Sequence, residues 1–115
     1  MEKKLQEMKL AAHRGGDPPL TGEELETYLS QLPDWDVVEE DGVRKVQRTF
    51  DFKNFAEALA FTNRVGEAAE EEGHHPVITV TWGKATVTWY THSIKGLHQN
   101  DFIMAAKTDD RYSHR

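Results

Sequence analysis

Residues 77–92 carry the sequence VITVTWGKATVTWYTH, and this stretch decides the fold. β-Branched and aromatic residues fill its two arms, residues 77–82 and 85–92. Residues of these types favour strands, and the two-residue link Gly83-Lys84 has the length that joins antiparallel strands in a tight hairpin. The stretch therefore predicts a β-hairpin.

The register of this hairpin follows from the position of its loop. Counting outward from Gly83-Lys84 places His75 directly opposite His92. Side chains alternate between the two faces of a strand, so apolar and polar residues are expected to separate. The apolar face should carry Ile78, Val80, Trp82, Ala85, Val87 and Trp89. The two histidines are then expected on the more polar face, as cross-strand neighbours.

Outward from the hairpin, the chain predicts a second hairpin and three helices. The arms at 35–39 and 43–52 flank Asp41-Gly42, a pair that tolerates the positive φ of a type I′ turn. Apolar residues at three- and four-residue steps predict helices over residues 21–32, 53–72 and about 97–108. Phe61 lies outside the apolar stripe of the central helix, which indicates a second contact surface.

The predicted order is helix, hairpin, helix, hairpin, helix. Pairing the two hairpins gives an α+β fold, a four-stranded antiparallel sheet with helices packed on one face. Residues 21–112 should form this single domain. Residues 1–20 are expected to be an N-terminal appendage, a helical segment followed by a loop rich in glycine and proline.

Composition excludes several classes of function. The 115 residues suffice for one core, and the formal net charge is −6 with no cluster of basic residues, so direct nucleic-acid binding is not expected. Cysteine is absent, which excludes disulfides, thiolate zinc sites and a cysteine nucleophile. No apolar run has the pattern of a signal peptide or the length of a membrane span. We therefore expect a soluble cytoplasmic protein without a membrane partner.

His74, His75 and His92 are the candidate catalytic residues. An imidazole has an ordinary pKa of about 6.5, so one ring can give a proton near neutral pH while another takes one. Adjacent histidines bind one metal only with a contorted backbone, and no HExxH motif is present, so no metal site is expected. The plain alternative is that these are unrelated surface histidines. Their convergence by register favours an active site.

The spacing of these residues resembles a known family. Glu70, three residues, His74-His75-Pro76, five residues, Trp82, nine residues, His92, eight residues and Asp101 match the motif of the pterin-4a-carbinolamine dehydratases. The similarity extends from Leu20 to about Asp110 and so leaves only the first twenty residues outside it. His98 departs from the family pattern, which usually has serine or threonine at that helix start.

The resemblance implies a fold and a reaction. The fold is again a four-stranded antiparallel sheet with helices on one side. The reaction is loss of water from 4a-hydroxytetrahydropterin to give quinonoid dihydropterin, without a metal or an organic cofactor. Reduction of that product restores the tetrahydropterin used by aromatic amino acid hydroxylases, so a functional link to such a hydroxylase is implied. A homo-oligomer, dimer or tetramer, is implied as well.

Carried over residue by residue, the resemblance assigns catalysis to His74, His75 and His92. It assigns substrate contact to positions in the same two segments, namely Gly73, His74, His75, Tyr90, Thr91, His92 and Ser93. Which histidine is the acid and which is the base stays open.

Three further residues are candidates for a supporting role. Glu70 stands one turn before His74 and either orients its ring or belongs to a solvated helix end, which we favour. Asp101 stands at the start of the last helix, where a carboxylate is favoured by the helix dipole, and we expect that structural role rather than catalysis. Trp35 either walls the pocket or lies in the core, which is the commoner place for such an aromatic residue. Trp82 is expected in the core.

Two non-catalytic hypotheses compete with the enzyme. The same fold could serve as a dimerisation or assembly cofactor, as some relatives of the family do, or as a pterin-binding regulator of a hydroxylase. Intact histidines count against a purely structural role.

Overall fold

The computed structural model describes residues 4–11 and 17–113. In chain order its elements are η1 (Leu5–Glu7), α1 (Gly22–Ser30), β1 (Asp36–Glu40), β2 (Val43–Asp51), α2 (Phe55–Glu72), β3 (Val77–Thr81), β4 (Lys84–Trp89), η2 (His92–Ile94) and α3 (Gln99–Ser113). The η elements are single 3-10 turns. The predicted order of helices and hairpins is confirmed.

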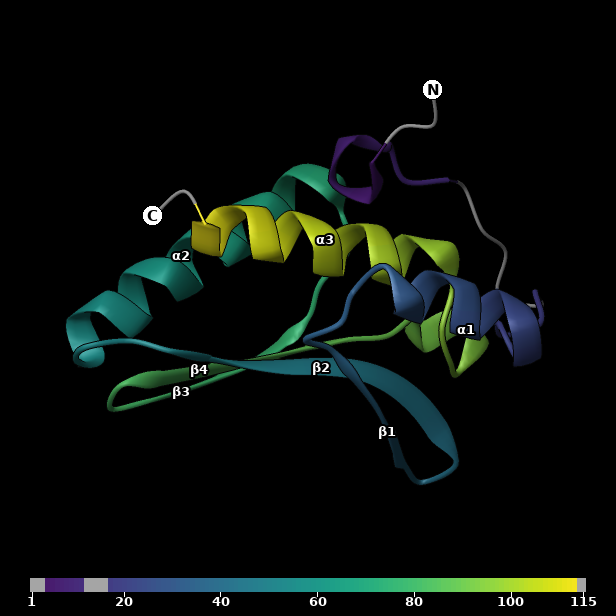
Figure 1. Ribbon diagram of the computed structural model, residues 1–115, viewed down its shortest axis with the longest axis horizontal. Coiled ribbons are helices and arrows are strands. Elements are labelled where there is room, and N and C mark those ends of the chain that lie inside the picture. The colour runs from purple at the N-terminus through teal and green to yellow at the C-terminus, as the bar shows by residue number, and fades with distance from the viewer. Residues whose placement is uncertain (1–3, 12–16, 114–115) are drawn as a thin grey trace.

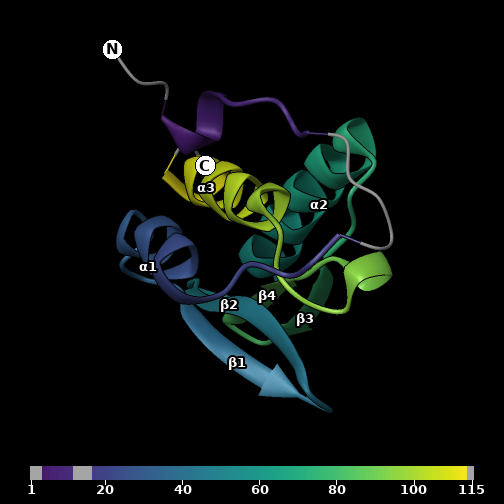
Figure 2. The same ribbon diagram turned by 90° about the vertical axis from the view of Figure 1, so that its right-hand side faces the viewer.

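The four strands form one antiparallel sheet in the order β1-β2-β4-β3, so β2 and β4 join the two hairpins at its centre. All three α-helices lie on the same face of the sheet, as both views show (Figures 1 and 2). The fold is therefore the expected α+β architecture. The side chains of β4 that point toward the helices, Ala85, Val87 and Trp89, are completely buried.

The β3–β4 hairpin differs from its predicted register by two residues. Thr81 pairs with Lys84 and Val80 pairs with Ala85, so the loop is Trp82-Gly83 rather than Gly83-Lys84. Gly83 supplies the positive φ of 74° at the second loop position, while Lys84 stays in the strand and its Nζ lies 2.8 Å from Asp51 Oδ1. Trp82 is consequently at the turn and 72% exposed, so its predicted core position is wrong.

The first hairpin has the predicted turn. Glu40 pairs with Val43, and Asp41 and Gly42 have φ angles of 52° and 77°. Positive φ at both central positions is the requirement of a type I′ turn, whose twist matches that of the strands.

Helix α2 buries much of its predicted apolar stripe, including Ala58, Val65 and Ala69, but the buried face also takes in Phe61. Phe61 is completely buried and packs against Phe50, Phe52 and Tyr112, so the second contact surface inferred from it is wrong. Leu59, another apolar residue of the same helix, is 42% exposed. Both side chains are apolar, and packing against the aromatic cluster from β2, the residue after it and α3 buries Phe61.

Part of the N-terminal segment lies against helix α3. Leu5 is buried in the core, and Met8 and Leu10 pack against it in part. The predicted helical segment is a single 3-10 turn over its described residues, while Met1, Ala12 and most of the glycine-proline loop lie outside them. Over the described ranges, no helix has the length and apolar character needed to cross a membrane.

Candidate functional site

The three histidines meet at the edge of the sheet where β3 begins and β4 has ended. Gly73, with a φ of 64°, closes α2 and turns the chain directly into His74. After β4, Thr91 bridges Gly96, and the chain enters η2 at His92. These two segments line a hollow of about 340 Å³, within the usual size range of small-ligand pockets. Its lining is Gly73, His74, His75, Pro76, Val77, Tyr90, Thr91, His92 and Ser93.

The histidines reach this hollow from opposite faces of the sheet. If the observed register is continued past Val77, His74 falls beside Thr91 and His75 falls beside Tyr90. His75 is therefore not the direct cross-strand neighbour of His92, and the predicted pairing of these two histidines is wrong. Because opposed residues share a face, His74 belongs to the helix-covered face with Trp89, and His75 belongs to the other.

His74 is the most tightly held of the three. Its Nε2 lies 2.6 Å from Asp101 Oδ1, and its ring stacks on the Trp89 indole at a centroid distance of 5.7 Å and an angle of 8°. Trp89 is fixed in turn, because its Nε1 donates to the Thr108 hydroxyl at 3.1 Å. With Nε2 engaged, Nδ1 is the nitrogen with which His74 would exchange a proton.

Asp101 is a buried carboxylate with partners on both oxygens. Its side chain is completely buried, and Oδ2 accepts from the Thr91 hydroxyl at 2.8 Å and from the His98 backbone N–H at 2.9 Å. The contact with His98 is the predicted helix-start role. The contact with His74 was not predicted, because it joins residues 27 positions apart. Asp101 therefore bonds the start of helix α3 through one oxygen and holds the His74 ring through the other.

His98, the departure from the family pattern, still caps the last helix. Its Nδ1 accepts from the Asn100 backbone N–H at 3.0 Å, the kind of bond that a serine or threonine cap would make. The helix start is thereby settled at Gln99.

His75 and His92 are exposed and lie on the other side of the hollow. His92 Nδ1 is 3.1 Å from the Tyr90 hydroxyl, and Lys45 Nζ lies over the Tyr90 ring at 4.4 Å from its centroid. His75 Nε2 is 3.6 Å from Glu70 Oε1, an exposed pair that water screens. Glu70 thus faces His75, not His74.

Trp35 lies away from this hollow. It is buried, packs edge-on against Phe50, and donates from Nε1 to Asp109 Oδ1 at 2.9 Å. The described residues contain no group of three or more histidine, aspartate or glutamate side chains placed to hold a metal ion. Tyr90 is one of the predicted contact residues. Lys45 is not among them, because it comes near Tyr90 only through the pairing of β2 with β4.

Comparison with known proteins places these residues in a family. A family model described as pterin 4 alpha carbinolamine dehydratase matches residues 18–111. A Microcystis aeruginosa protein provisionally named pterin-4-alpha-carbinolamine dehydratase is 51% identical over 94% of this chain and 93% of its own length. A Syntrophotalea carbinolica protein with the same provisional name is 57% identical over 92% of this chain and 95% of its own.

Two solved structures are similar in fold. One is titled transcriptional coactivator/pterin dehydratase from Brucella melitensis, with 33% identity and a TM-score of 0.74 over 81% of this chain and 97% of that chain. The other is titled a pterin dehydratase-like protein as a RuBisCO assembly factor in the α-carboxysome. Its TM-score is 0.57 and its identity 20%, over 68% of this chain and 88% of that chain, so it shares the fold alone.

Proposed function

Because the chain belongs to the pterin-4a-carbinolamine dehydratase family, we propose that it dehydrates 4a-hydroxytetrahydropterin to quinonoid dihydropterin. The observation that carries the proposal is the lining of one hollow by three histidines, one of them held by a completely buried carboxylate. This arrangement supplies two kinds of imidazole, one fixed and one exposed, at the same small cavity.

The reaction needs two proton transfers and no redox partner. An imidazolium gives its proton to the 4a oxygen, the carbon–oxygen bond breaks, and water leaves. The lone pair of the neighbouring ring nitrogen forms the new carbon–nitrogen double bond, and a base takes the proton from the ring system. The substrate loses one water, and the protons on the two imidazoles are restored by exchange with solvent. Each placed transfer contributes about 10² to 10⁴ in rate.

We assign the base to His74 and the acid to the exposed pair. The Asp101 carboxylate at 2.6 Å fixes the tautomer of His74 and stabilises the imidazolium that forms when the ring takes a proton. His92, held through Nδ1 by Tyr90, keeps Nε2 for the leaving oxygen. His75, which borders both this hollow and a neighbouring one between α2 and β3, is placed to assist it.

The remaining residues that line the hollow are proposed either to contact the pterin or to support the Asp101 carboxylate. Gly73, Tyr90 and Ser93 are proposed to touch the pterin. Thr91 is almost fully buried and its hydroxyl donates to Asp101, so its side chain supports the carboxylate. The quinonoid product would be reduced back to tetrahydropterin, which would link this protein to an aromatic amino acid hydroxylase.

A direct assay tests the proposal. The purified protein is supplied with 4a-hydroxytetrahydropterin, and quinonoid product is followed by absorbance in wild type, His74→Ala, His75→Ala and His92→Ala. We expect kcat to fall about 10²- to 10⁴-fold for His74→Ala and His92→Ala and less for His75→Ala. Urea unfolding of each variant controls for folding. Full activity in all three folded variants would overturn the site assignment.

The alternative is a non-enzymatic dimerisation or assembly cofactor on the same fold. The Brucella melitensis structure, described as both a transcriptional coactivator and a pterin dehydratase, favours keeping this alternative. A folded wild-type protein that gives no dehydration above the spontaneous rate would support this alternative over the enzyme.

A further inference from the structure

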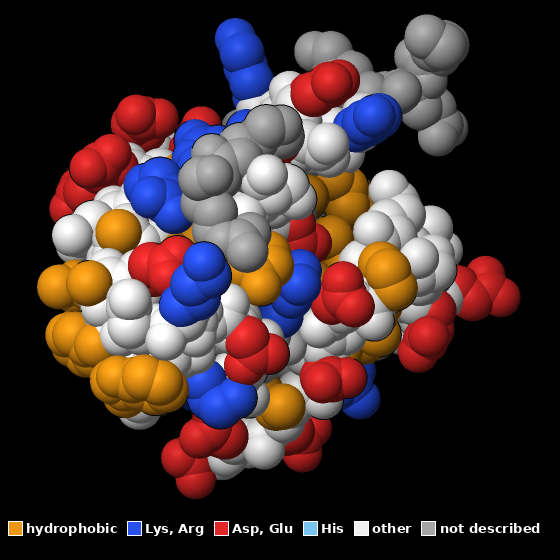
Figure 3. Space-filling view, turned by 60° about the vertical axis from the view of Figure 1, so that its left-hand side comes forward, with side chains coloured by type: hydrophobic (Ala, Val, Ile, Leu, Met, Phe, Trp, Pro, Cys, Tyr) orange, Lys and Arg blue, Asp and Glu red, His pale blue; other side chains and the backbone are white. Residues whose placement is uncertain are grey.

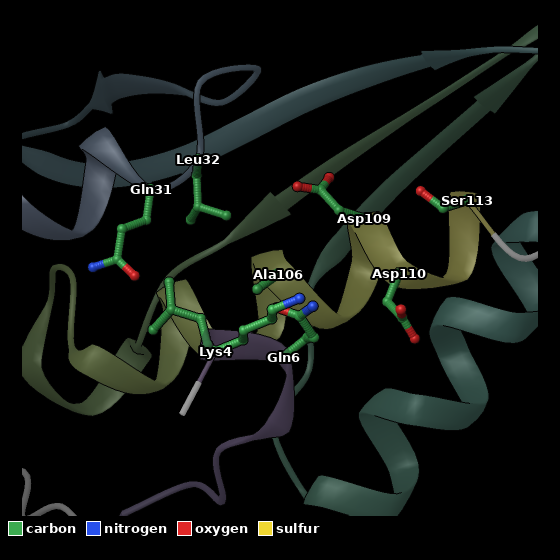
Figure 4. A pocket seen from close by; sticks show the side chains of 9 residues that line it. Lys4, Gln6, Gln31, Leu32, Ala106, Asp109, Asp110 and Ser113 are labelled. Atoms are coloured by element: carbon green, nitrogen blue, oxygen red, sulfur yellow. The ribbon is translucent and has the colours of Figure 1, made fainter. Parts of the chain in front are cut away.

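Residues 4–11, here called the N-terminal strap, are built onto helix α3. Leu5 is buried in the core beside the helix, and Lys107 Nζ donates to the Gln6 carbonyl oxygen at 3.0 Å. Figure 4 shows Lys4 and Gln6 of the strap beside Ala106 of α3. The family model begins only at residue 18, so this contact is additional to the part of the chain that it matches.

Asn100 anchors the other end of the strap. Its Oδ1 accepts from the Ala11 backbone N–H at 2.8 Å, and its Nδ2 donates to the Ala11 carbonyl oxygen at 2.7 Å. A carboxamide carries a donor and an acceptor side by side, so it can satisfy both main-chain groups of one residue, as a neighbouring strand would. Asn100 is only 2% exposed, so these two hydrogen bonds are sheltered from water.

The anchor lies in the same helical turn as the carboxylate of the site. Asn100 precedes Asp101, and its backbone N–H donates to His98 Nδ1 at 3.0 Å. Asp101 Oδ2 accepts from the His98 N–H, so these residues form one hydrogen-bonded first turn. Any tilt of that turn moves Asp101, whose Oδ1 meets His74 at 2.6 Å.

We infer that Asn100 is a positioning residue, which clamps the strap to the first turn of α3 and so fixes Asp101 against His74. Its consequence for catalysis rests on the proposed dehydratase function, whereas its effect on the His74–Asp101 contact does not. A short charge-assisted hydrogen bond is specific in geometry, so a small displacement of the turn weakens it. The strap therefore acts on the site from outside the hollow.

The test uses four variants of the full chain. Asn100→Ala removes both hydrogen bonds to Ala11, and Ala11→Pro removes the N–H of this exposed strap residue without altering the buried helix. Lys107→Ala is the matched control, because it removes another side-chain bond to the strap, six residues along α3 from Asp101. Asp101→Asn breaks the contact itself and sets the full size of the effect.

Two readouts separate this inference from the proposed function. The first is solvent exchange of the His74 ring proton in the bond to Asp101, measured by NMR without substrate. We expect about tenfold faster exchange in Asn100→Ala and Ala11→Pro and no change in Lys107→Ala. The second is kcat, expected to fall about tenfold in the same two variants while KM is retained.

Each outcome decides one of the two proposals. Wild-type exchange rates in a folded Ala11→Pro or Asn100→Ala protein would overturn the clamp, whatever the activity. Equal acceleration in Lys107→Ala would also overturn it, because the strap would then act through general stability. A wild-type protein without dehydratase activity would remove the proposed function and leave the exchange measurement to decide the clamp.

Discussion

Burial of a carboxylate is costly unless its oxygens are bonded, and Asp101 meets that requirement with three partners. Two of them, Thr91 and the His98 N–H, share Oδ2, while His74 occupies Oδ1. The bonds that cap helix α3 therefore also aim the carboxylate at the imidazole. Capping and positioning are one set of contacts, so the choice between an architectural and a functional Asp101 does not arise.

Asp109 is a second carboxylate held by several groups, on the same helix but away from the histidines. Its Oδ1 accepts from Trp35 Nε1 at 2.9 Å and from Arg48 Nη1 at 2.7 Å. Burial raises the pKa of the Asp109 carboxyl above its ordinary value, although the bonds from Trp35 and Arg48 act in the opposite direction. The cost of burying the charged carboxylate outweighs the stabilisation of that charge by Trp35 and Arg48.

This balance predicts how the stability contribution of Asp109 changes with pH. Because its pKa is higher in the folded state than in the unfolded state, its contribution is fully present at pH values below the unfolded pKa. It is lost as the pH rises through the folded pKa. Asp109→Asn cannot titrate, so we expect its stability deficit relative to wild type to shrink with rising pH, as measured by urea unfolding across the acid range.

A matched variant controls for the charge of Arg48. Asp34 is an exposed carboxylate 3.7 Å from the same Arg48 Nη1, so Asp34→Asn removes a charge beside this arginine without opening the core. A deficit of Asp109→Asn that instead grew with pH would mean that the ion pair with Arg48 dominates, contrary to the predicted sign.

At the scale of the element, the β3–β4 turn depends on one glycine. Gly83 has a φ of 74°, and a Cβ added there would lie 3.3 Å from the Phe52 carbonyl oxygen. Gly42 has a similar φ of 77° in the other hairpin but open space around it. Gly42→Ala should therefore cost only the backbone strain, about 1–2 kcal/mol. We expect Gly83→Ala to lose more free energy of unfolding in urea, and equal losses would show that the Phe52 contact is unimportant.

The same turn shows what could be predicted from the sequence. The alternation of Ala85, Val87 and Trp89 was predictable because a two-residue shift of register leaves every side chain on its face. The register itself was not, since a glycine can supply positive φ at either loop position. Trp82 moved from the core to the turn for that reason alone.

The sequence predicts which residues belong to the candidate site, but it does not predict the contacts that they make. The motif places His74, His75 and His92 in two segments that the hairpin brings together, and all three line one hollow. The partner of His74 depends on how helix α3 packs on the sheet, a tertiary relation that no local spacing encodes. Likewise, whether Phe61 or Leu59 is buried depends on aromatic side chains from other segments of the chain, namely Phe50, Phe52 and Tyr112.

At the scale of the whole molecule, large apolar side chains remain uncovered. Within the described residues, Phe55 and Leu59 of α2, Val77 of β3 and Trp82 of the turn are the exposed large hydrophobic residues. Figure 3 shows hydrophobic side chains gathered along one margin of the face it presents. Exposed apolar patches on a folded domain commonly mark an interaction surface.

We therefore expect the protein to self-associate through the exposed face of α2. Leu59→Glu places a charge in an apolar contact, where its desolvation is costly, and should shift sedimentation equilibrium toward the monomer. Ser30→Glu adds the same charge at an exposed position of α1 and should leave the distribution unchanged. Because Leu59 and Ser30 are both exposed, neither substitution places a charge in the core, and near-UV circular dichroism should report an intact fold in both variants. A wild-type protein that sediments as a monomer at all concentrations would contradict the prediction, and would leave the uncovered residues of α2 without a second copy of the chain to bury them.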